Sequence, residues 1–218
     1  MHKIQRAQPF WFLAVFLFSF LLGQTSYAAT SDAQAAAGVV QDMTHTVLQI
    51  LQKNEGKPIT PALKKEVAAA IIPHIDFNTM SAYVMASYWR QMTAAQKKEF
   101  TELFQELLVK TYSNALNQYH GQEVRVEGSQ QISQNPPVAQ VNMDIEQEQG
   151  KTIPVIYALI ENGKQWQIYN IYVDGVSLVL NYRQAFGNIA GQRGIPALLQ
   201  ELKHKVADAG NTSSAHAS

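Results

Sequence analysis

The spacing of apolar residues changes twice along this chain, and that change limits the folds open to it. Up to Gly121 the apolar side chains recur at the three- and four-residue spacing of helices. From Glu123 to Val173 they alternate at the two-residue spacing of strands, and after Asp174-Gly175 the helical spacing returns. Helices, then a block of strands, then helices again predict an α+β fold rather than alternating βαβ units.

Capping residues mark the starts of the expected helices. Thr60 precedes Pro61, Asp76 precedes an apolar helical stretch, and Thr93 with Gln96 has the spacing of a capping box. Ser177 stands at the same place before the segment that follows the strands. Helices are expected over residues 32–54, 61–72, 77–88, 94–120, 178–188 and 196–207.

Short turns separate the expected strands. Asn135-Pro136-Pro137, Gln149-Gly150 and Asn162-Gly163 are typical turn sequences. Strands joined by such short connections pair antiparallel with their neighbours in the chain. The sequence therefore predicts a four-stranded antiparallel meander, over residues 123–127, 138–146, 151–161 and 165–173, with helices packed mainly on one face.

The N-terminal segment is expected to be a targeting signal and not part of the fold. Lys3 and Arg6 precede an apolar run over residues 10–22, and Ser26 and Ala28 supply small residues at a cleavage site. The alternative, an uncleaved membrane anchor, is disfavoured because 13 residues fall short of the ~20 that span a bilayer. We predict a signal peptide over residues 1–28, one domain over residues 29–209, and a flexible tail over residues 210–218.

Composition removes several classes of function. The chain has no cysteine, so disulfides and thiolate chemistry are excluded, and its 17 basic and 17 acidic residues give none of the basic excess of nucleic-acid binders. No histidines stand at metal-ligand spacing, so no metal site is expected. Asp76 and Asp174 could serve an enzyme of the cone-shaped, ketosteroid-isomerase-like kind, but capping of helices explains both without catalysis.

The apolar residues of the strands and of the facing helices form either a solid core or the lining of a pocket. Composition does not separate the two, and a solid core is the commoner case. A solid core would suit an exported interaction module without a ligand. Tyrosines and a tryptophan near Asp174 would suit the mouth of a pocket for an amphiphile, because they join an apolar body to a polar tip.

Four segments resemble the MlaC, or toluene-tolerance, family of periplasmic phospholipid-binding proteins. The most specific is WQIYNIYVDGVSLV over residues 166–179, followed by NYR over residues 181–183. The others are IDFNTM over residues 75–80, YWRQMTAAQ over 88–96 and LNQYHG over 116–121. Together they spread over nearly all of the chain that follows the signal peptide.

The resemblance implies a lipid carrier and not an enzyme. Members of the family carry phospholipids across the periplasm between an outer-membrane lipoprotein–porin complex and an inner-membrane ABC transporter with an MCE-domain protein, and this traffic maintains outer-membrane lipid asymmetry. The implied cargo is a phospholipid, with its acyl tails in an apolar pocket between the sheet and the helices. No cofactor is implied.

Two hypotheses about individual residues follow from this function. Arg90 and Arg183, with Lys97 and Lys98, are candidates for contact with the headgroup or with partner proteins, and the alternative, an ordinary solvated face, is the commoner case. One position departs from the family, which commonly has an aspartate where this chain has Asn170, so we expect no role for a charge there, while the expected apolar pocket is unaffected. The expected tail-binding residues come from the strands and the facing helices: Phe104, Leu108, Tyr112, Val155, Tyr157, Leu159, Trp166, Ile168, Tyr172, Val179, Tyr182 and Phe186.

Overall fold

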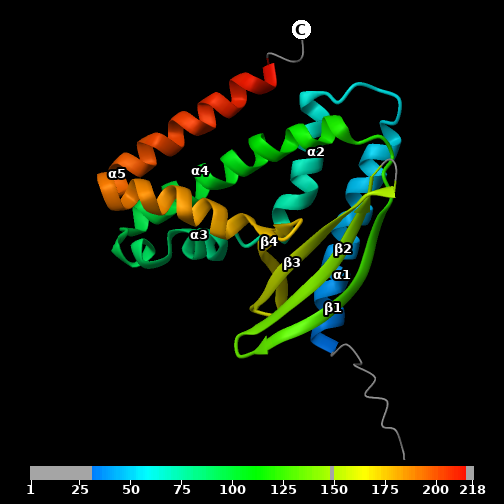
Figure 1. The fold of residues 1–218 in the computed structure, drawn as a ribbon, viewed down its shortest axis with the longest axis horizontal. Coiled ribbons are helices and arrows are strands. Elements are labelled where there is room, and N and C mark those ends of the chain that lie inside the picture. The colour runs from blue at the N-terminus through cyan, green and yellow to red at the C-terminus, as the bar shows by residue number, and fades with distance from the viewer. Residues whose placement is uncertain (1–30, 148–149, 215–218) are drawn as a thin grey trace, which may run out of the picture.

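The computed structural model describes residues 31–147 and 150–214, and it has the predicted α+β architecture (Figure 1). The predicted signal peptide lies outside the described residues. The first half of the chain is helical, with 3₁₀ turns (η) between or after the longer helices. These elements are α1 (Ser31–Lys53), α2 (Pro61–Ile71), η1 (Ile72–His74), α3 (Phe77–Met85), η2 (Ala86–Gln91), α4 (Ala94–Ser113) and η3 (Asn114–Gln118).

The predicted caps form as hydrogen bonds. The side chains of Thr60, Asp76 and Thr93 accept from the backbone N–H groups of the residues three positions later, and Gln96 completes the capping box with Thr93. Two helices end earlier than their apolar spacing predicts. The stretch 77–88 becomes 3₁₀ at Ala86, which has a φ of 48°, and the stretch 94–120 becomes 3₁₀ at Asn114.

The sheet is an antiparallel meander in the order β1-β2-β3-β4-β5. Its fifth strand corrects the prediction of four. Asp174 and Gly175 both have positive φ, at 50° and 77°, so they turn the chain back on itself and Val176 pairs with Val173. The strands are β1 (Val124–Gln134), β2 (Pro137–Glu146), β3 (Thr152–Asn162), β4 (Gln165–Val173) and β5 (Val176–Ser177).

The last helix, α5 (Leu178–Ser214), has two halves that meet at a sharp bend (Figure 1). Gly194 makes the bend with a φ of 80° and a ψ of 169°, values that glycine adopts without steric cost. The predicted helices 178–188 and 196–207 are thus both present, and each is longer than predicted. Residues 210–214 of the predicted tail continue the helix, whereas residues 215–218 lie outside the described part of the chain.

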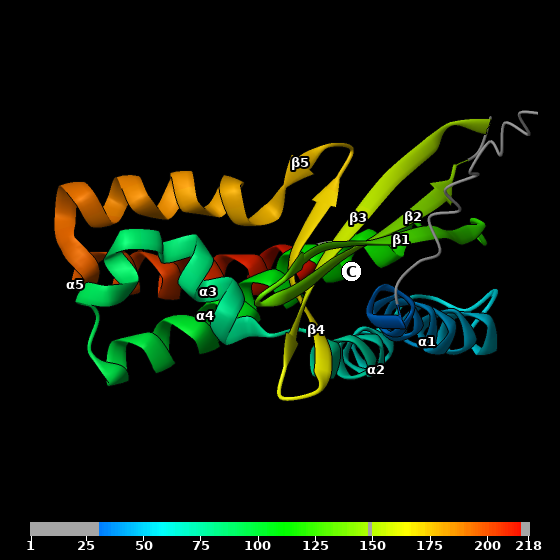
Figure 2. The same cartoon turned by 90° about the horizontal axis from the view of Figure 1, so that it is seen from below.

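The helices form two groups: α1 and α2 lie along one face of the sheet, and the others lie beyond its end (Figure 2). The first group is α1 with α2, and α1 packs its Ala36, Val40 and Met43 on Ala139 and Leu159 of the sheet. The second group is the helical lobe, made of α3, η2, α4 and α5, which share one core. The expectation of helices on one face of the sheet therefore holds for α1, but the lobe helices pack mainly on one another.

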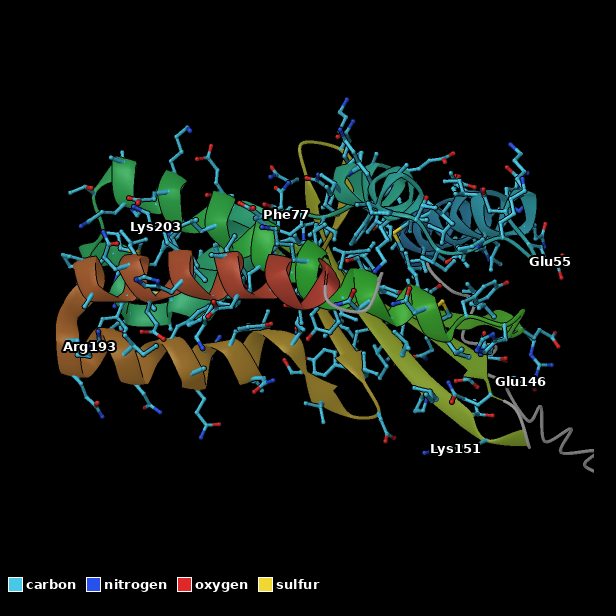
Figure 3. All side chains as sticks on the ribbon, turned by 90° about the horizontal axis from the view of Figure 1, so that it is seen from above. Glu55, Phe77, Glu146, Lys151, Arg193 and Lys203 are labelled. Atoms are coloured by element: carbon cyan, nitrogen blue, oxygen red, sulfur yellow. The ribbon has the colours of Figure 1, made fainter. Side chains whose placement is uncertain are left out.

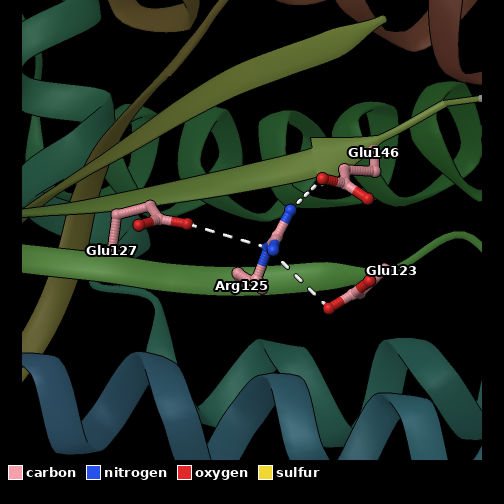
Figure 4. Close-up of polar contacts among 4 residues, drawn as sticks. All are labelled: Glu123, Arg125, Glu127 and Glu146. Atoms are coloured by element: carbon pink, nitrogen blue, oxygen red, sulfur yellow. Dashed lines mark hydrogen bonds and ion pairs between the residues drawn. The ribbon is translucent and has the colours of Figure 1, made fainter. Parts of the chain in front are cut away.

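A cluster of charged side chains lies at one end of β1 and β2, on the face that points away from α1. Arg125 on β1 pairs with Glu146 on β2 and lies 3.8 Å from Glu123 and 3.9 Å from Glu127 (Figure 4). Successive side chains of β1 point to opposite faces of the sheet, so Glu123, Arg125 and Glu127 lie on one face and Val126 on the other. Val126 packs against the core beneath α1. This polar surface contrasts with the apolar side of the same strands.

Candidate functional site

An apolar cavity of about 240 Å³ lies between the helices and the sheet. Its floor is formed by Tyr157 of β3 with Ile168 and Ile171 of β4, and its walls come from α2, α3 and α4. Phe77 is one of the wall residues and is buried, and Figure 3 shows it near the middle of the molecule's length, whereas Glu55 and Arg193 lie toward opposite ends. We call this space the first cavity.

A second cavity, of about 350 Å³, adjoins the first beneath α1. It is bounded by α1, by the start of β1, by the C-terminal end of β2 and by η3. Met43, Ile71, Leu116 and Tyr157 line both spaces. The two cavities are therefore neighbours that share part of their lining, and we call the two together the cavity region.

A third pocket, of about 670 Å³, adjoins the second cavity. It lies between the loop that joins α1 to α2 and the loop that joins η3 to β1, and it shares Leu51 and Tyr119 with the second cavity. Its lining mixes apolar side chains with Glu55, Lys57 and His120. The lining thus changes from apolar in the first two cavities to mixed polar and apolar in the third pocket.

A bulge in β4 selects the side chains that form the floor of the first cavity. Ala158 pairs with Asn170 while Leu159 pairs with Ile168, so Tyr169 is an extra residue on β4. The extra residue reverses the alternation, and Ile171 comes to share a face with Ile168. Tyr172, which strict alternation would place beside Ile168, pairs with Ile156 on the opposite face.

Two tyrosines have hydroxyl groups in apolar surroundings, Tyr157 in the lining of both cavities and Tyr182 against the core of the helical lobe. Burial raises the pKa of Tyr157 to about 12, because the apolar surroundings disfavour the phenolate. Burial is also the main cause that raises the pKa of Tyr182 to about 12, and a hydrogen bond with Tyr112 acts in the same direction. Both phenols therefore stay neutral at physiological pH and act as polar tips on apolar bodies.

The structure brings four of the twelve expected tail-binding residues to the cavity lining. Leu108, Tyr112, Tyr157 and Ile168 line the first cavity, and Tyr157 lines the second as well. The other eight lie outside the lining of both cavities, so their contact with lipid stays a prediction. Phe104, Val179, Tyr182 and Phe186 lie in or against the core of the helical lobe, Leu159 and Trp166 lie beneath α1, and Val155 and Tyr172 belong to the strands.

The helical half of the chain supplies lining residues that the sequence analysis did not select. Met43 of α1, Ile71 of α2, Ile75 and Leu116 contribute apolar side chains, and Lys64 contributes a cation. Their helical periodicity indicated a buried face but not what that face would meet. Because both a core and a cavity lining are apolar, no sequence signal separates these residues from ordinary core residues.

A buried polar corner joins the last strands to α5. The Asn170 side-chain oxygen accepts hydrogen bonds from the N–H groups of Ile171 at 2.9 Å and Val179 at 3.1 Å, and its amide donates to the Ser177 hydroxyl at 3.0 Å. Ser177 in turn accepts from the N–H of Leu180, so it caps α5 as predicted. Three of these four bonds come from backbone N–H groups and the fourth joins the Asn170 and Ser177 side chains, which gives the corner a structural role.

The two aspartates considered for an enzyme have other roles. Asp76 accepts from the N–H and the hydroxyl of Thr79 at 2.8 and 2.6 Å, and Asp174 is exposed in the turn before β5. Neither belongs to the lining of the three spaces described above. The carboxyl group that a ketosteroid-isomerase-like site requires inside its pocket is therefore not supplied by either residue.

The two arginines expected to contact a headgroup or partners lie on the helical lobe. Arg90 is exposed in η2, and Arg183 donates from Nε to the Tyr83 carbonyl oxygen at 2.8 Å. Within residues 31–147 and 150–214, no three acidic or histidine side chains are grouped so as to hold a metal ion. Across the same residues, none of the helices has the length and apolar character needed to cross a bilayer.

The fold and the cavity region together define an α+β protein with partly open, apolar cavities between its sheet and its helices. Comparison with known proteins agrees with that class. The profile of the MlaC protein family matches residues 41–204. The chain belongs to the MlaC family.

Relatives and a solved structure extend the comparison. The chain is 24% identical over 208 residues to the intermembrane phospholipid transport system binding protein MlaC of Haemophilus influenzae, covering 93% of this chain and 95% of that protein. It is 28% identical over 168 residues to the toluene tolerance protein ttg2D of Pseudomonas putida, covering 76% and 77% of the two chains. A phospholipid-binding protein from Ralstonia solanacearum, solved in complex with a phospholipid, shares the fold with a TM-score of 0.69 at 23% identity, covering 80% of this chain and 98% of that one.

Proposed function

We propose that this protein is a periplasmic phospholipid carrier, which moves lipid between outer- and inner-membrane transport complexes and thereby maintains outer-membrane lipid asymmetry. The observation that carries the proposal is the cavity region, in which two apolar spaces adjoin between the sheet and the helices of an MlaC-family chain. The names of the Haemophilus and Ralstonia proteins, which refer to phospholipid transport and phospholipid binding, support the same function.

The physical need for a carrier follows from the cost of exposing acyl chains to water. Each methylene that leaves an apolar environment costs about 0.8 kcal/mol, so a tail of about sixteen carbons costs roughly 12 kcal/mol. A phospholipid with two tails therefore does not cross an aqueous compartment unaided at a useful rate. The carrier replaces bilayer contacts with equivalent apolar contacts and performs no covalent chemistry.

The cavity region must widen to hold such a cargo. The first cavity, at about 240 Å³, is below the ~300–1,000 Å³ usual for ligand sites, and a two-tailed lipid requires the upper end of that range or more. Rotation of Met43, Ile71, Leu116 and Tyr157 would merge the two spaces. We therefore propose that the helices around the cavity region, α4 and the start of α5 included, move outward when lipid enters.

The remaining features of the proposal follow the family. Residues 1–28 direct export to the periplasm, and residues 29–209 form a single lipid-binding domain. The partners are an inner-membrane ABC transporter with an MCE-domain protein and an outer-membrane lipoprotein–porin complex. Arg90 and Arg183, which lie on the helical lobe outside the lining of the cavities, are proposed as contacts with these partners.

The test is to fill the first cavity and measure the bound lipid. Ala68 lines that cavity, and its neighbour Ala69 is exposed on the same helix. We expect Ala68→Phe to reduce the phospholipid that co-purifies from a bacterial periplasm, measured by native mass spectrometry, while Ala69→Phe retains it. A wild-type protein that carries no phospholipid in this measurement would contradict the proposal and favour an enzyme or an interaction module.

A further inference from the structure

One charged side chain lines the apolar cavities. Among the described residues around the first and second cavities, Lys64 of α2 is the only Lys, Arg, His, Asp or Glu. Its ammonium group donates to the Asn114 side-chain oxygen at 2.8 Å, and none of the ion pairs found in the described part of the chain includes it. A half-buried cation beside an apolar cavity is costly unless an anion meets it, so its position requires an explanation.

The Lys64 side chain lies at the open side of the first cavity. The deepest lining residues, such as Met80 and Ile168, are fully buried, whereas Tyr112 on α4 is 47% exposed. Lys64 projects from α2, which faces α4 across the cavity, and its bond to Asn114 joins α2 to the 3₁₀ turn that follows α4. The ammonium therefore lies where the apolar lining ends.

An amphiphile whose tails occupy this cavity would bring its polar group to the same place. In a phospholipid the phosphodiester, which is anionic, directly adjoins the acyl-bearing glycerol. An ammonium group on a flexible stem makes a charge-assisted hydrogen bond to phosphate more strongly than to a neutral amide oxygen. The phosphate would therefore displace Asn114 as the partner of Lys64.

We infer that Lys64 binds the phosphate group of the cargo lipid at the mouth of the first cavity. This inference rests on the proposed carrier function. It predicts that Lys64 distinguishes phospholipids from uncharged lipids with the same tails, while the apolar lining binds the tails of both.

The experiment compares two ligands with identical fluorescent acyl chains, a phosphatidylglycerol and a diacylglycerol that lacks the phosphate. Each is titrated into the delipidated full mature chain, as wild type, Lys64→Gln and Lys64→Arg, with Lys65→Gln as the matched control, because Lys65 is exposed on the same helix. We expect Lys64→Gln to weaken phosphatidylglycerol binding about tenfold and to leave diacylglycerol binding unchanged. Lys64→Arg, which keeps the charge, and Lys65→Gln should both stay near wild type.

Three other results of these titrations would contradict either the role of Lys64 or the carrier function. If Lys64→Gln binds phosphatidylglycerol as wild type does, or loses both ligands equally, Lys64 does not recognise the phosphate. If inorganic phosphate alone raises the melting temperature of wild type but not of Lys64→Gln, while lipid affinity is unaffected, the site recognises free phosphate and not a lipid headgroup. If wild type binds neither lipid, the carrier function itself is wrong.

Discussion

The helical lobe and the cavity region are built from similar apolar residues but are packed in opposite ways. In the lobe, Phe100, Phe104 and Phe186 are almost fully buried, with ring centroids 5.7 to 5.9 Å apart. In the cavity region, the side chains of Ile71 and Tyr157 are only half-buried and face empty space. Similar composition thus gives a solid core in one place and room for an apolar ligand in the other.

This difference shows how the protein can take up cargo and remain folded. A close-packed core does not deform easily, since loss of even one methylene of packing is costly. The lobe, which includes most of α4 and α5, is therefore expected to move as one body rather than to deform. The cavity region, which meets the lobe along α3 and α4, already lacks part of its packing and can widen at lower cost.

The largest expected effect comes from the same truncation made in each region. Leu202 is fully buried in the lobe, and Leu116 lines both cavities. We expect Leu202→Ala to lower the free energy of unfolding by about 3–4 kcal/mol, but Leu116→Ala by only about 1–2 kcal/mol, because space already adjoins Leu116. Urea denaturation of the two variants would measure this, and equal losses would show that the regions are packed alike.

A smaller effect is expected at the polar corner that joins β4 and β5 to α5. Asn170→Ala leaves the buried N–H of Val179 without its partner and should cost about 2 kcal/mol. Asn170→Asp keeps an oxygen that accepts from the same N–H groups, so it should lose less than the alanine variant. Thermal unfolding would compare the two, and an aspartate variant less stable than the alanine variant would contradict the account.

Alkaline pH tests the apolar character of the cavity region. The pKa of Tyr157 is about 12 in the folded chain, against about 10 in an unfolded one. Below pH 10 the phenol is protonated in both states and its contribution is fully present. As pH rises from about 10 to 12 the unfolded state loses the proton first, so stability falls. Tyr157→Phe should remove part of this loss, as followed by denaturant unfolding across that range, and an unchanged slope would oppose the assignment.

The smallest effect is expected on the charged face of the sheet. Arg125→Ala removes a half-exposed cation from among Glu123, Glu127 and Glu146 and should cost at most about 1 kcal/mol. The loss should shrink in high salt, because exposed charges are screened. Lys98→Ala, which removes a single exposed ion pair with Glu102, is the control and should change stability less. A loss from Arg125→Ala that exceeds that of Leu202→Ala would mean that surface charge, and not packing, stabilises the fold.

Local sequence signals account for most of the elements of this fold. Thr60, Asp76 and Thr93 cap the predicted helices, and Ser177 caps α5. The fifth strand was missed, although Asp174-Gly175 is a typical two-residue hairpin sequence, because the strand after it has only two residues. Caps and turns can thus be predicted from the sequence when the helix or strand that follows them is long enough to show a regular spacing of apolar residues.

The candidate site could be predicted only in part, because its residues depend on contacts between distant segments. Tyr157 and Ile168, which are expected from the sequence to contact lipid, line the first cavity, and their contact with lipid stays a prediction. Ile171, which is not among the expected residues, also lines this cavity because of the bulge at Tyr169, and nothing in the local sequence marks that bulge. Nothing in the sequence distinguishes Lys64, because a lysine on an amphipathic helix is ordinarily a solvated residue.

The sequence by itself determined the α+β class, the caps, most of the strands and the family, because each depends on short-range periodicity or on a motif that is continuous in the chain. Only the tertiary structure decided which apolar faces pack against one another and which enclose space. The physical reason is that a filled core and a cavity wall require the same apolar side chains. They differ only in the distance between elements, which packing of the whole chain sets.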